Sequence, residues 1–173
     1  MTTNPSPKTH PAALPPKQLE RECRMRARRD QGPGGQHRNK VETAVEIEHL
    51  PTGVVAEATE RRSQAANRQK ALFRLRIRLA LAVRSDRSAP SPSPLWKSRC
   101  RSGRIQINAE HDDFPAMLAE ALDEIVGADW EMNVAAEGLG VSVSQLVKLL
   151  KKEPAALAKV NSIRKERGLR PLL

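Results

Sequence analysis

A glycine-rich segment near residue 35 is the part of the sequence best suited to chemistry. In order, it consists of Gly32, Pro33, Gly34, Gly35, Gln36, His37, Arg38, Asn39 and Lys40. Adjacent glycines allow a backbone to adopt positive φ angles and to approach a ligand closely. Gln36 is uncharged and is therefore a poor general base, but backbone N–H groups in such a loop can stabilise a developing oxyanion. The segment is a candidate catalytic loop for acyl transfer.

The side chains that follow Gln36 are suited to RNA. His37, Arg38 and Lys40 can donate hydrogen bonds to a phosphate backbone. Chemistry alone leaves a second interpretation open, because glycine-rich turns beside basic residues also occur in loops that have no function.

Regular elements are predicted on both sides of this loop. Over residues 23–28 apolar and basic side chains alternate, which indicates a strand with one basic face. Alternation resumes over residues 45–50, and after a turn residues 54–58 can return as the partner strand of a hairpin. Ser63 is a suitable N-cap for a long helix that runs to about Arg84. The pattern predicts a small sheet that carries the loop and is covered by one helix.

Short motifs separated along this unit resemble the catalytic domain of bacterial class I peptide chain release factors. Besides the glycine-rich segment, they are Ala44-Val45, His49-Leu50-Pro51-Thr52-Gly53, Arg62-Ser63-Gln64 and Asn67. Their order and spacing match as well, and the resemblance covers about residues 19–83, under half of the chain. The sequence departs from the family at Arg38, where valine is usual, and at Ala65-Ala66, which replaces a more polar pair.

The resemblance implies ribosome-dependent hydrolysis of the ester that joins a nascent peptide to its tRNA. In that family the loop enters the peptidyl transferase centre. The Gln36 N–H would stabilise the transition state or the leaving 3′-hydroxyl, its side chain would position water, and Gly34 and Gly35 would permit the required backbone shape. The family also implies the ribosome as partner, no cofactor, and a glutamine methyltransferase that acts on Gln36.

The predicted site residues form two groups. The catalytic group is Gly34, Gly35 and Gln36. The RNA-binding group is His37, Arg38, Asn39, Lys40, Arg61, Arg62, Gln64, Asn67, Lys148, Lys151 and Lys152. No metal site is predicted, because the four histidines are scattered without cysteines or carboxylates at metal-ligand spacing.

The fold class predicted for the whole chain is α+β, with a release-factor-like catalytic domain followed by a small all-α unit. Residues 1–18 are expected to be a disordered arm, because they are rich in proline and poor in apolar side chains. Residues 19–87 form the catalytic domain, and residues 88–110 form a linker and a basic irregular segment. Residues 111–173 form a helical domain with a basic tail. Its helices are expected at about 114–126, 133–139 and 144–152, with a last one starting near Pro154.

The apolar spacing from Ala135 to Leu149 is typical of a helix-turn-helix, with Gly140 at the turn. Two roles for this unit stay open. Lys148, Lys151 and Lys152 would contact nucleic acid if the second helix is a recognition helix. A structural or protein-docking role is the alternative, because the preceding helix is acidic: residues 110–137 carry nine acidic side chains and no Lys or Arg.

Composition narrows the class of partner. The net charge of +10 and the pI of about 10.3 favour a polyanion. The chain has two Phe, two Trp and no Tyr, which argues against binding of single strands by base stacking. Two cysteines cannot make a disulfide framework, and no apolar run reaches about 20 residues. The chain is therefore expected to be a cytoplasmic monomer without a membrane segment.

Release factors that read stop codons carry a separate recognition domain with a Pro-any-Thr or Ser-Pro-Phe tripeptide. Neither tripeptide occurs after residue 87, and the remaining residues leave no room for such a domain. The chain is therefore expected to act like short, codon-independent hydrolases that rescue stalled ribosomes. The alternatives are a non-catalytic RNA- or DNA-binding helix-turn-helix protein and a ribosome assembly factor.

Overall fold

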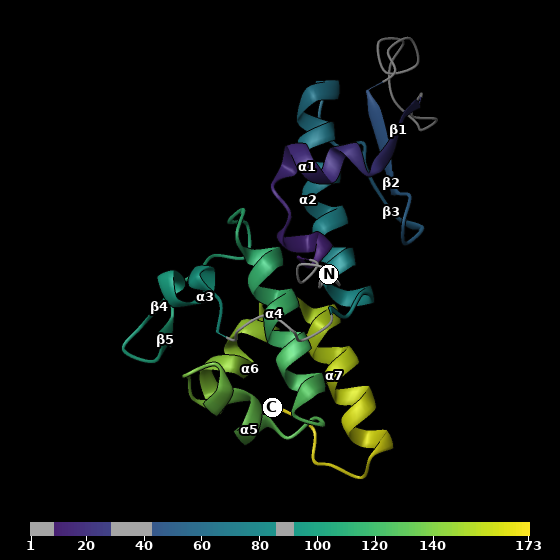
Figure 1. Cartoon of the computed structure of the whole chain (residues 1–173). Helices are drawn as coiled ribbons and strands as arrows, with labels where there is room; N and C mark the ends of the chain where they lie inside the picture. The colour runs from purple at the N-terminus through teal and green to yellow at the C-terminus, as the bar shows by residue number, and fades with distance from the viewer. Residues whose placement is uncertain (1–8, 29–42, 86–91) are drawn as a thin grey trace, which may run out of the picture.

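The computed structural model describes residues 9–28, 43–85 and 92–173 (Figure 1). The elements of the first part are a 3₁₀ helix η1 (Pro11–Ala13), α1 (Pro16–Arg21), β1 (Cys23–Arg28), β2 (Ala44–His49), β3 (Val54–Ala58) and α2 (Gln64–Ala82). Those of the second part are α3 (Pro94–Arg99), β4 (Cys100–Arg101), β5 (Arg104–Ile105), α4 (Phe114–Gly127), α5 (Met132–Gly138), α6 (Val143–Lys151) and α7 (Pro154–Glu166). The predicted α+β class, with a sheet unit followed by helices, is confirmed.

The sheet has the order β1-β2-β3, and both strand pairs are antiparallel. The predicted alternation in β1 is present over residues 23–26, since Cys23 and Met25 are half-buried whereas Arg24 and Arg26 are exposed; Ala27, expected on the apolar side, is exposed. Alternation follows from strand geometry, because successive side chains point to opposite faces. The sheet therefore presents one apolar face to α2 and one polar face to solvent.

Helix α2 covers the apolar face of the sheet. Its N-cap is Ser63, as predicted, and the Ser63 side chain accepts a hydrogen bond from the Ala66 N–H. The buried side chains of α2 include Leu72, Leu75 and Leu79. Two arginines of α2 also reach the sheet: Arg74 donates to the Glu57 carbonyl over 2.9 Å, and Arg78 donates to the Val55 carbonyl. These two arginines thus bind the backbone of β3, which is an edge strand of the described sheet.

The expectation of a disordered arm is wrong for the described residues 9–18. Ala12 and Leu14 are buried, and η1 contacts both α2 and α4. Arg76 of α2 donates to the Ala12 carbonyl over 3.0 Å, and His10 is hydrogen-bonded to the Val83 carbonyl over 3.2 Å. Burial lowers the pKa of His10. Proline-rich composition suggests disorder locally, but here a few apolar side chains pack against two helices.

In the second part the helices predicted from apolar spacing are present, with bounds shifted by at most one residue. Helix α3 was not predicted, because Pro94 lies in a Pro/Ser-rich stretch. Its Trp96 is fully buried, and the Trp96 Nε1–H donates to the Leu139 carbonyl over 2.9 Å. Within the segment expected to be irregular, β5 pairs antiparallel with β4. No helix within the described residues is long and apolar enough to cross a membrane.

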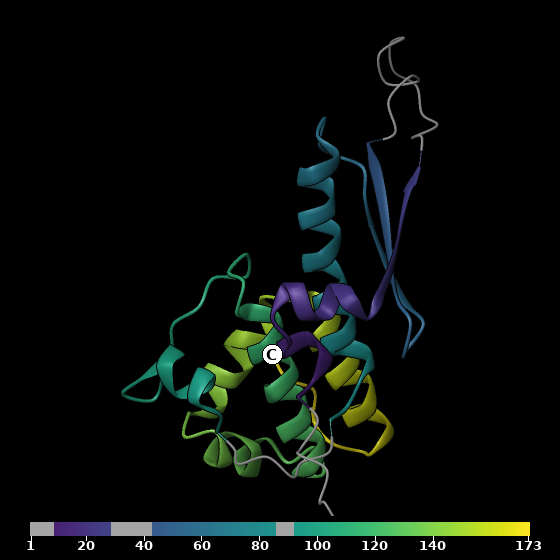
Figure 2. The ribbon, with the colours of Figure 1, turned by 45° about the horizontal axis from the view of Figure 1, so that its top comes forward.

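The two parts share one apolar core, in which α2 packs along α4 (Figure 2). Both described flanks of residues 86–91 are tied to α4. Arg84 forms an ion pair with Asp123 over 2.9 Å, and the Ser93 N–H donates to Glu120 over 2.6 Å. We propose that the chain nevertheless divides near residues 85–94, as the Pro/Ser-rich composition suggests.

Limited proteolysis will test this division. The first cut is expected at 85–94 and should give two bands on a denaturing gel. The cleaved protein should still elute as a single species in size-exclusion chromatography, because the packing of α2 against α4 would hold the two fragments together. A first cut inside α2, or separation of the two fragments without denaturant, would contradict this prediction.

Candidate catalytic site

The predicted catalytic residues Gly34, Gly35 and Gln36 lie outside the described residues, as do His37, Arg38, Asn39 and Lys40. The structure describes the strands that precede and follow them. β1 ends at Arg28 and β2 begins at Ala44, and these two residues are paired in the ladder. Both views place this end of the sheet away from α4–α7 (Figures 1 and 2). The candidate loop therefore starts and finishes on adjacent strands at the end of the molecule remote from the helical part.

Asn67 connects this end of the sheet to the start of α2. Its side chain is fully buried, and its Nδ2 donates to the Thr43 carbonyl over 2.6 Å and to the Arg61 carbonyl over 2.9 Å. Its Oδ1 accepts from the Arg61 N–H over 2.9 Å. Because the amide is enclosed and its bonds are made to the backbone, the predicted RNA contact of Asn67 is wrong. Asn67 is a positioning residue, which holds the chain where it enters β2.

Replacing Asn67 by leucine is expected to lower the free energy of unfolding by about 3 kcal/mol, since three backbone groups lose their partner and each unsatisfied buried group costs about 1–3 kcal/mol. Chemical denaturation will measure the change. The matched control is Gln69→Ala on the exposed face of the same helix, which should change stability by less than about 0.5 kcal/mol. A loss no larger than that of the control would show that the Asn67 bonds hold nothing in place.

The turn between β2 and β3 is held by a second polar cluster. His49 is almost fully buried, its Nδ1 lies 2.7 Å from the Thr52 hydroxyl and its Nε2 lies 3.1 Å from a Glu22 carboxylate oxygen. Gly53 adopts a φ of 68°, which favours glycine. The motif at residues 49–53 therefore shapes the hairpin. Sequence patterns did not indicate Glu22, because its partner is 27 positions away.

The other predicted RNA-binding residues lie at two separate places. Arg61, Arg62 and Gln64 are exposed at the start of α2, next to the Asn67 bonds, and therefore close to Thr43. Within the described parts of the chain, no carboxylate forms an ion pair with Arg61 or Arg62. Nearby, Arg74 and Lys70 are paired with Glu60, whose pKa is lowered to about 2, first by a hydrogen bond from its own backbone N–H.

The second place is α6. Lys148, Lys151 and Lys152 are exposed there, on the helical part of the molecule. Arg61 and Arg62 are thus the predicted cations that the structure brings near the ends of the candidate loop, and the α6 lysines form a different surface.

Other catalytic chemistry has little support among the described residues. Burial is the main cause that raises the pKa of the Cys23 thiol to about 11, so this thiol is protonated at neutral pH and is a poor nucleophile. Burial raises the pKa of Cys100 as well. No group of His, Cys, Asp and Glu within residues 9–28, 43–85 and 92–173 is arranged to hold a metal ion.

Comparison with known proteins matches residues 16–111 to the family described as RF-1 domain. Peptide chain release factor 1 of Leptothrix cholodnii is 38% identical over 123 residues, which are 62% of this chain and 34% of that protein. Peptide chain release factor 1 of Xylella fastidiosa is 53% identical over 60 residues, 35% of this chain and 17% of that protein. Peptide chain release factor PrfB1, chloroplastic, of Arabidopsis thaliana is 53% identical over 57 residues, 33% of this chain and 12% of that protein.

The chain matches about a third or less of the length of these relatives. The family match extends from α1 through the β4–β5 hairpin and covers more than half of the chain. It therefore includes the segment 88–110 that the sequence pattern suggested as a linker. The small sheet with its covering helix, and the loop sequence between β1 and β2, lie inside the matched range. This chain belongs to the RF-1 domain family, the family of class I release-factor catalytic domains.

Proposed function

We propose that the protein hydrolyses the ester bond of peptidyl-tRNA on the ribosome, with Gly34, Gly35 and Gln36 as its catalytic segment. The observation that carries the proposal is the Gly-Gly-Gln sequence between two paired strands of an RF-1 domain. The Asn67 bonds to Thr43 and Arg61 support it, because they fix the point at which the chain leaves the loop.

The proposed chemistry needs little from side chains. Water attacks the ester carbonyl, and the bond to the tRNA 3′ oxygen breaks. The Gln36 N–H stabilises the developing charge on oxygen, and the Gln36 side chain positions the water. Donors aimed at such a charge are among the largest contributions to catalysis. The rest of the site is supplied by ribosomal RNA, so the chain acts as a carboxylic ester hydrolase only in that setting.

The proposed partner is the ribosome. The exposed Arg61 and Arg62 would contact large-subunit RNA beside the loop, together with His37, Arg38, Asn39 and Lys40. A chain with a net charge of +10 is attracted to polyanions over several ångströms. We also propose that Gln36 is modified by a glutamine methyltransferase, and that the protein acts as a cytoplasmic monomer.

A peptide-release assay tests the function. Ribosomes that hold labelled peptidyl-tRNA in the P site are mixed with the protein, and the released peptide is counted over time. Release is expected to be catalytic and to require the ribosome, so free peptidyl-tRNA should stay intact. Binding to ribosomes without release would contradict the proposal and support a non-catalytic RNA-binding protein or an assembly factor instead.

A further inference from the structure

The β4–β5 hairpin is attached to the helix-turn-helix formed by α5 and α6. The Ile105 N–H donates to the Gln145 side-chain oxygen over 3.2 Å, which links β5 to α6. A Cβ placed on Gly103 would lie 3.9 Å from the Gly140 carbonyl oxygen, so the tip of the hairpin lies beside the turn between α5 and α6. Trp96 of α3 is bonded to the Leu139 carbonyl just before that turn. The hairpin therefore forms a wing on the helix-turn-helix.

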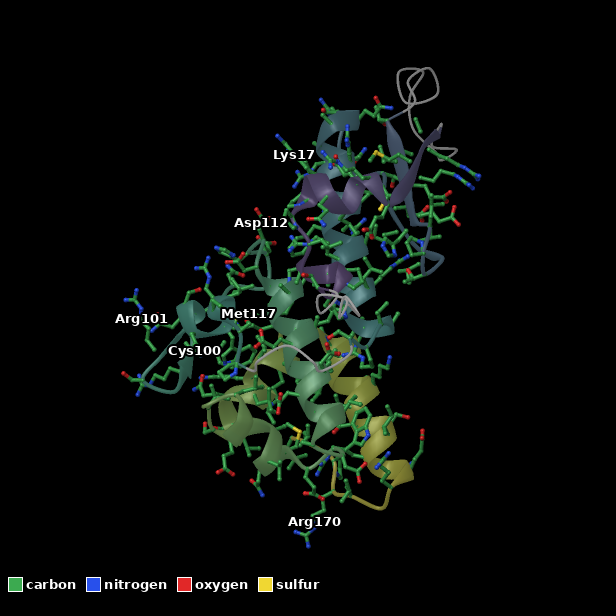
Figure 3. All side chains as sticks on the ribbon, in the orientation of Figure 1. Lys17, Cys100, Arg101, Asp112, Met117 and Arg170 are labelled. Atoms are coloured by element: carbon green, nitrogen blue, oxygen red, sulfur yellow. The ribbon has the colours of Figure 1, made fainter. Side chains whose placement is uncertain are left out.

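A basic groove runs between the wing and α6. Arg104, Ile105 and Gln106 line one side of it, and the other side is lined by Gln145, Lys148, Leu149, Lys151 and Lys152. Arg101, the ladder partner of Arg104, is exposed on the same hairpin and points away from the helices (Figure 3). No carboxylate lines the groove within the described part of the chain. We call Arg101, Arg104, Lys148, Lys151 and Lys152 the wing–α6 surface.

Several acidic residues of the helical part form contacts away from this surface. Asp123 pairs with Arg84, and Glu120 accepts hydrogen bonds from Ser93. Asp113 pairs with Arg99 over 2.9 Å, and Glu153 caps α7 by accepting from the Ala155 N–H. The acidic composition of residues 110–137 suggested a helix that repels phosphate, but several of these carboxylates form contacts within the protein. No ion pair among the described residues involves a cation of the wing–α6 surface.

We propose that the wing–α6 surface binds the sugar-phosphate backbone of double-stranded RNA. Four of the five cations line the groove between α6 and the hairpin, and Arg101 extends the basic surface beyond it. Such an arrangement can contact phosphates on both sides of a groove. Among the described residues, no aromatic side chain lines the groove, so it lacks the platforms on which single-stranded bases stack. Duplex RNA is bound mainly through its shape and backbone. The choice of RNA over DNA rests on the proposed ribosomal function.

The wing–α6 surface lies far from the strand ends that flank the candidate catalytic loop. It lies at the opposite end of the molecule from Arg28 and Ala44, between which the candidate catalytic loop is inserted (Figures 1 and 2). One end of the protein could therefore hold a ribosomal RNA helix while the loop reaches the ester. The shared core of α2 and α4 would fix the position of the loop-bearing sheet relative to the bound RNA.

Fluorescence anisotropy with an RNA duplex of about 16 base pairs, the span of a typical duplex-binding domain, will test the proposal on the full chain. Two double variants, Arg101→Glu with Arg104→Glu and Lys148→Glu with Lys151→Glu, change exposed residues only. The matched control, Lys165→Glu with Arg170→Glu, makes the same change in charge at exposed residues of the C-terminal segment; Arg170 is labelled in Figure 3. Each surface variant is expected to weaken binding roughly tenfold or more and to lower the salt slope by about two. The control should lose much less affinity.

Three results would overturn the proposal: equal weakening by the control and the surface variants, tighter binding of single-stranded RNA than of the duplex, or equal binding of a DNA duplex or an acidic polypeptide. Binding is measured without ribosomes, whereas the proposed hydrolysis is measured by peptide release, so either can fail without the other. Circular dichroism and thermal melting will verify that the variants are folded.

Discussion

Replacing Gln36 by alanine is expected to abolish measurable peptide release while ribosome binding stays nearly unchanged. The substitution removes the side chain that is proposed to position the attacking water and keeps the Gln36 N–H, whereas we expect most of the binding energy to come from basic residues elsewhere in the chain. Poor positioning of a reactant typically lowers a rate by about 10². Gly35→Ala should have a comparable effect by another route, because an added Cβ restricts the backbone angles on which the donor depends.

Single-turnover release on ribosomes with peptidyl-tRNA, together with a sedimentation assay for binding, will separate the two effects. Gln69→Ala is the matched control, since it makes the same substitution at an exposed position of α2. If both loop variants released peptide at the rate of the unmodified protein, catalysis by this loop would be excluded. If they also lost ribosome binding, the loop would be an anchor and its catalytic role would have to be withdrawn.

Release is expected to proceed at the same rate with a stop codon, a sense codon or no codon in the A site. A codon reader must hold specific side chains in the decoding centre while its loop reaches the ester. In this chain α4–α7 follow the catalytic unit, and residues after 87 contain no decoding tripeptide. Their basic residues can contact RNA phosphates, which carry no sequence information.

Initial rates on three otherwise identical ribosome complexes will measure this prediction. A strong preference for one stop codon would contradict it. Point variants on the wing–α6 surface are a better companion test than removal of residues 95–173, because truncation would uncover the buried face of α2 that packs on α4. Those variants should weaken ribosome binding equally for all three complexes.

Local patterns in the sequence were sufficient for much of the fold. Alternation over residues 23–28 predicted β1, and Ser63 with the leucines that follow it predicted α2. These predictions succeed because the period of side-chain direction and the capping of a helix depend on residues close together in the chain. The motifs around the loop also led to the RF-1 domain family, since their order is a property of the sequence alone. The roles assigned to Gly34, Gly35 and Gln36 stay predictions.

The tertiary structure alone decided which polar side chains are available to RNA and which hold the fold together. Asn67 and Arg61 lie only six positions apart in the sequence, on either side of the same motif. Asn67 is nevertheless enclosed by backbone from two segments, whereas Arg61 is exposed. Trp96 and Ala12 lie in proline-rich stretches that suggested irregular chain, but each is buried by partners distant in the sequence. The wing–α6 surface likewise depends on a bond between residues 40 positions apart. Whether a side chain is buried or paired depends on contacts with residues that are distant in the sequence and that only the folded chain brings together. Local patterns in the sequence therefore cannot predict it.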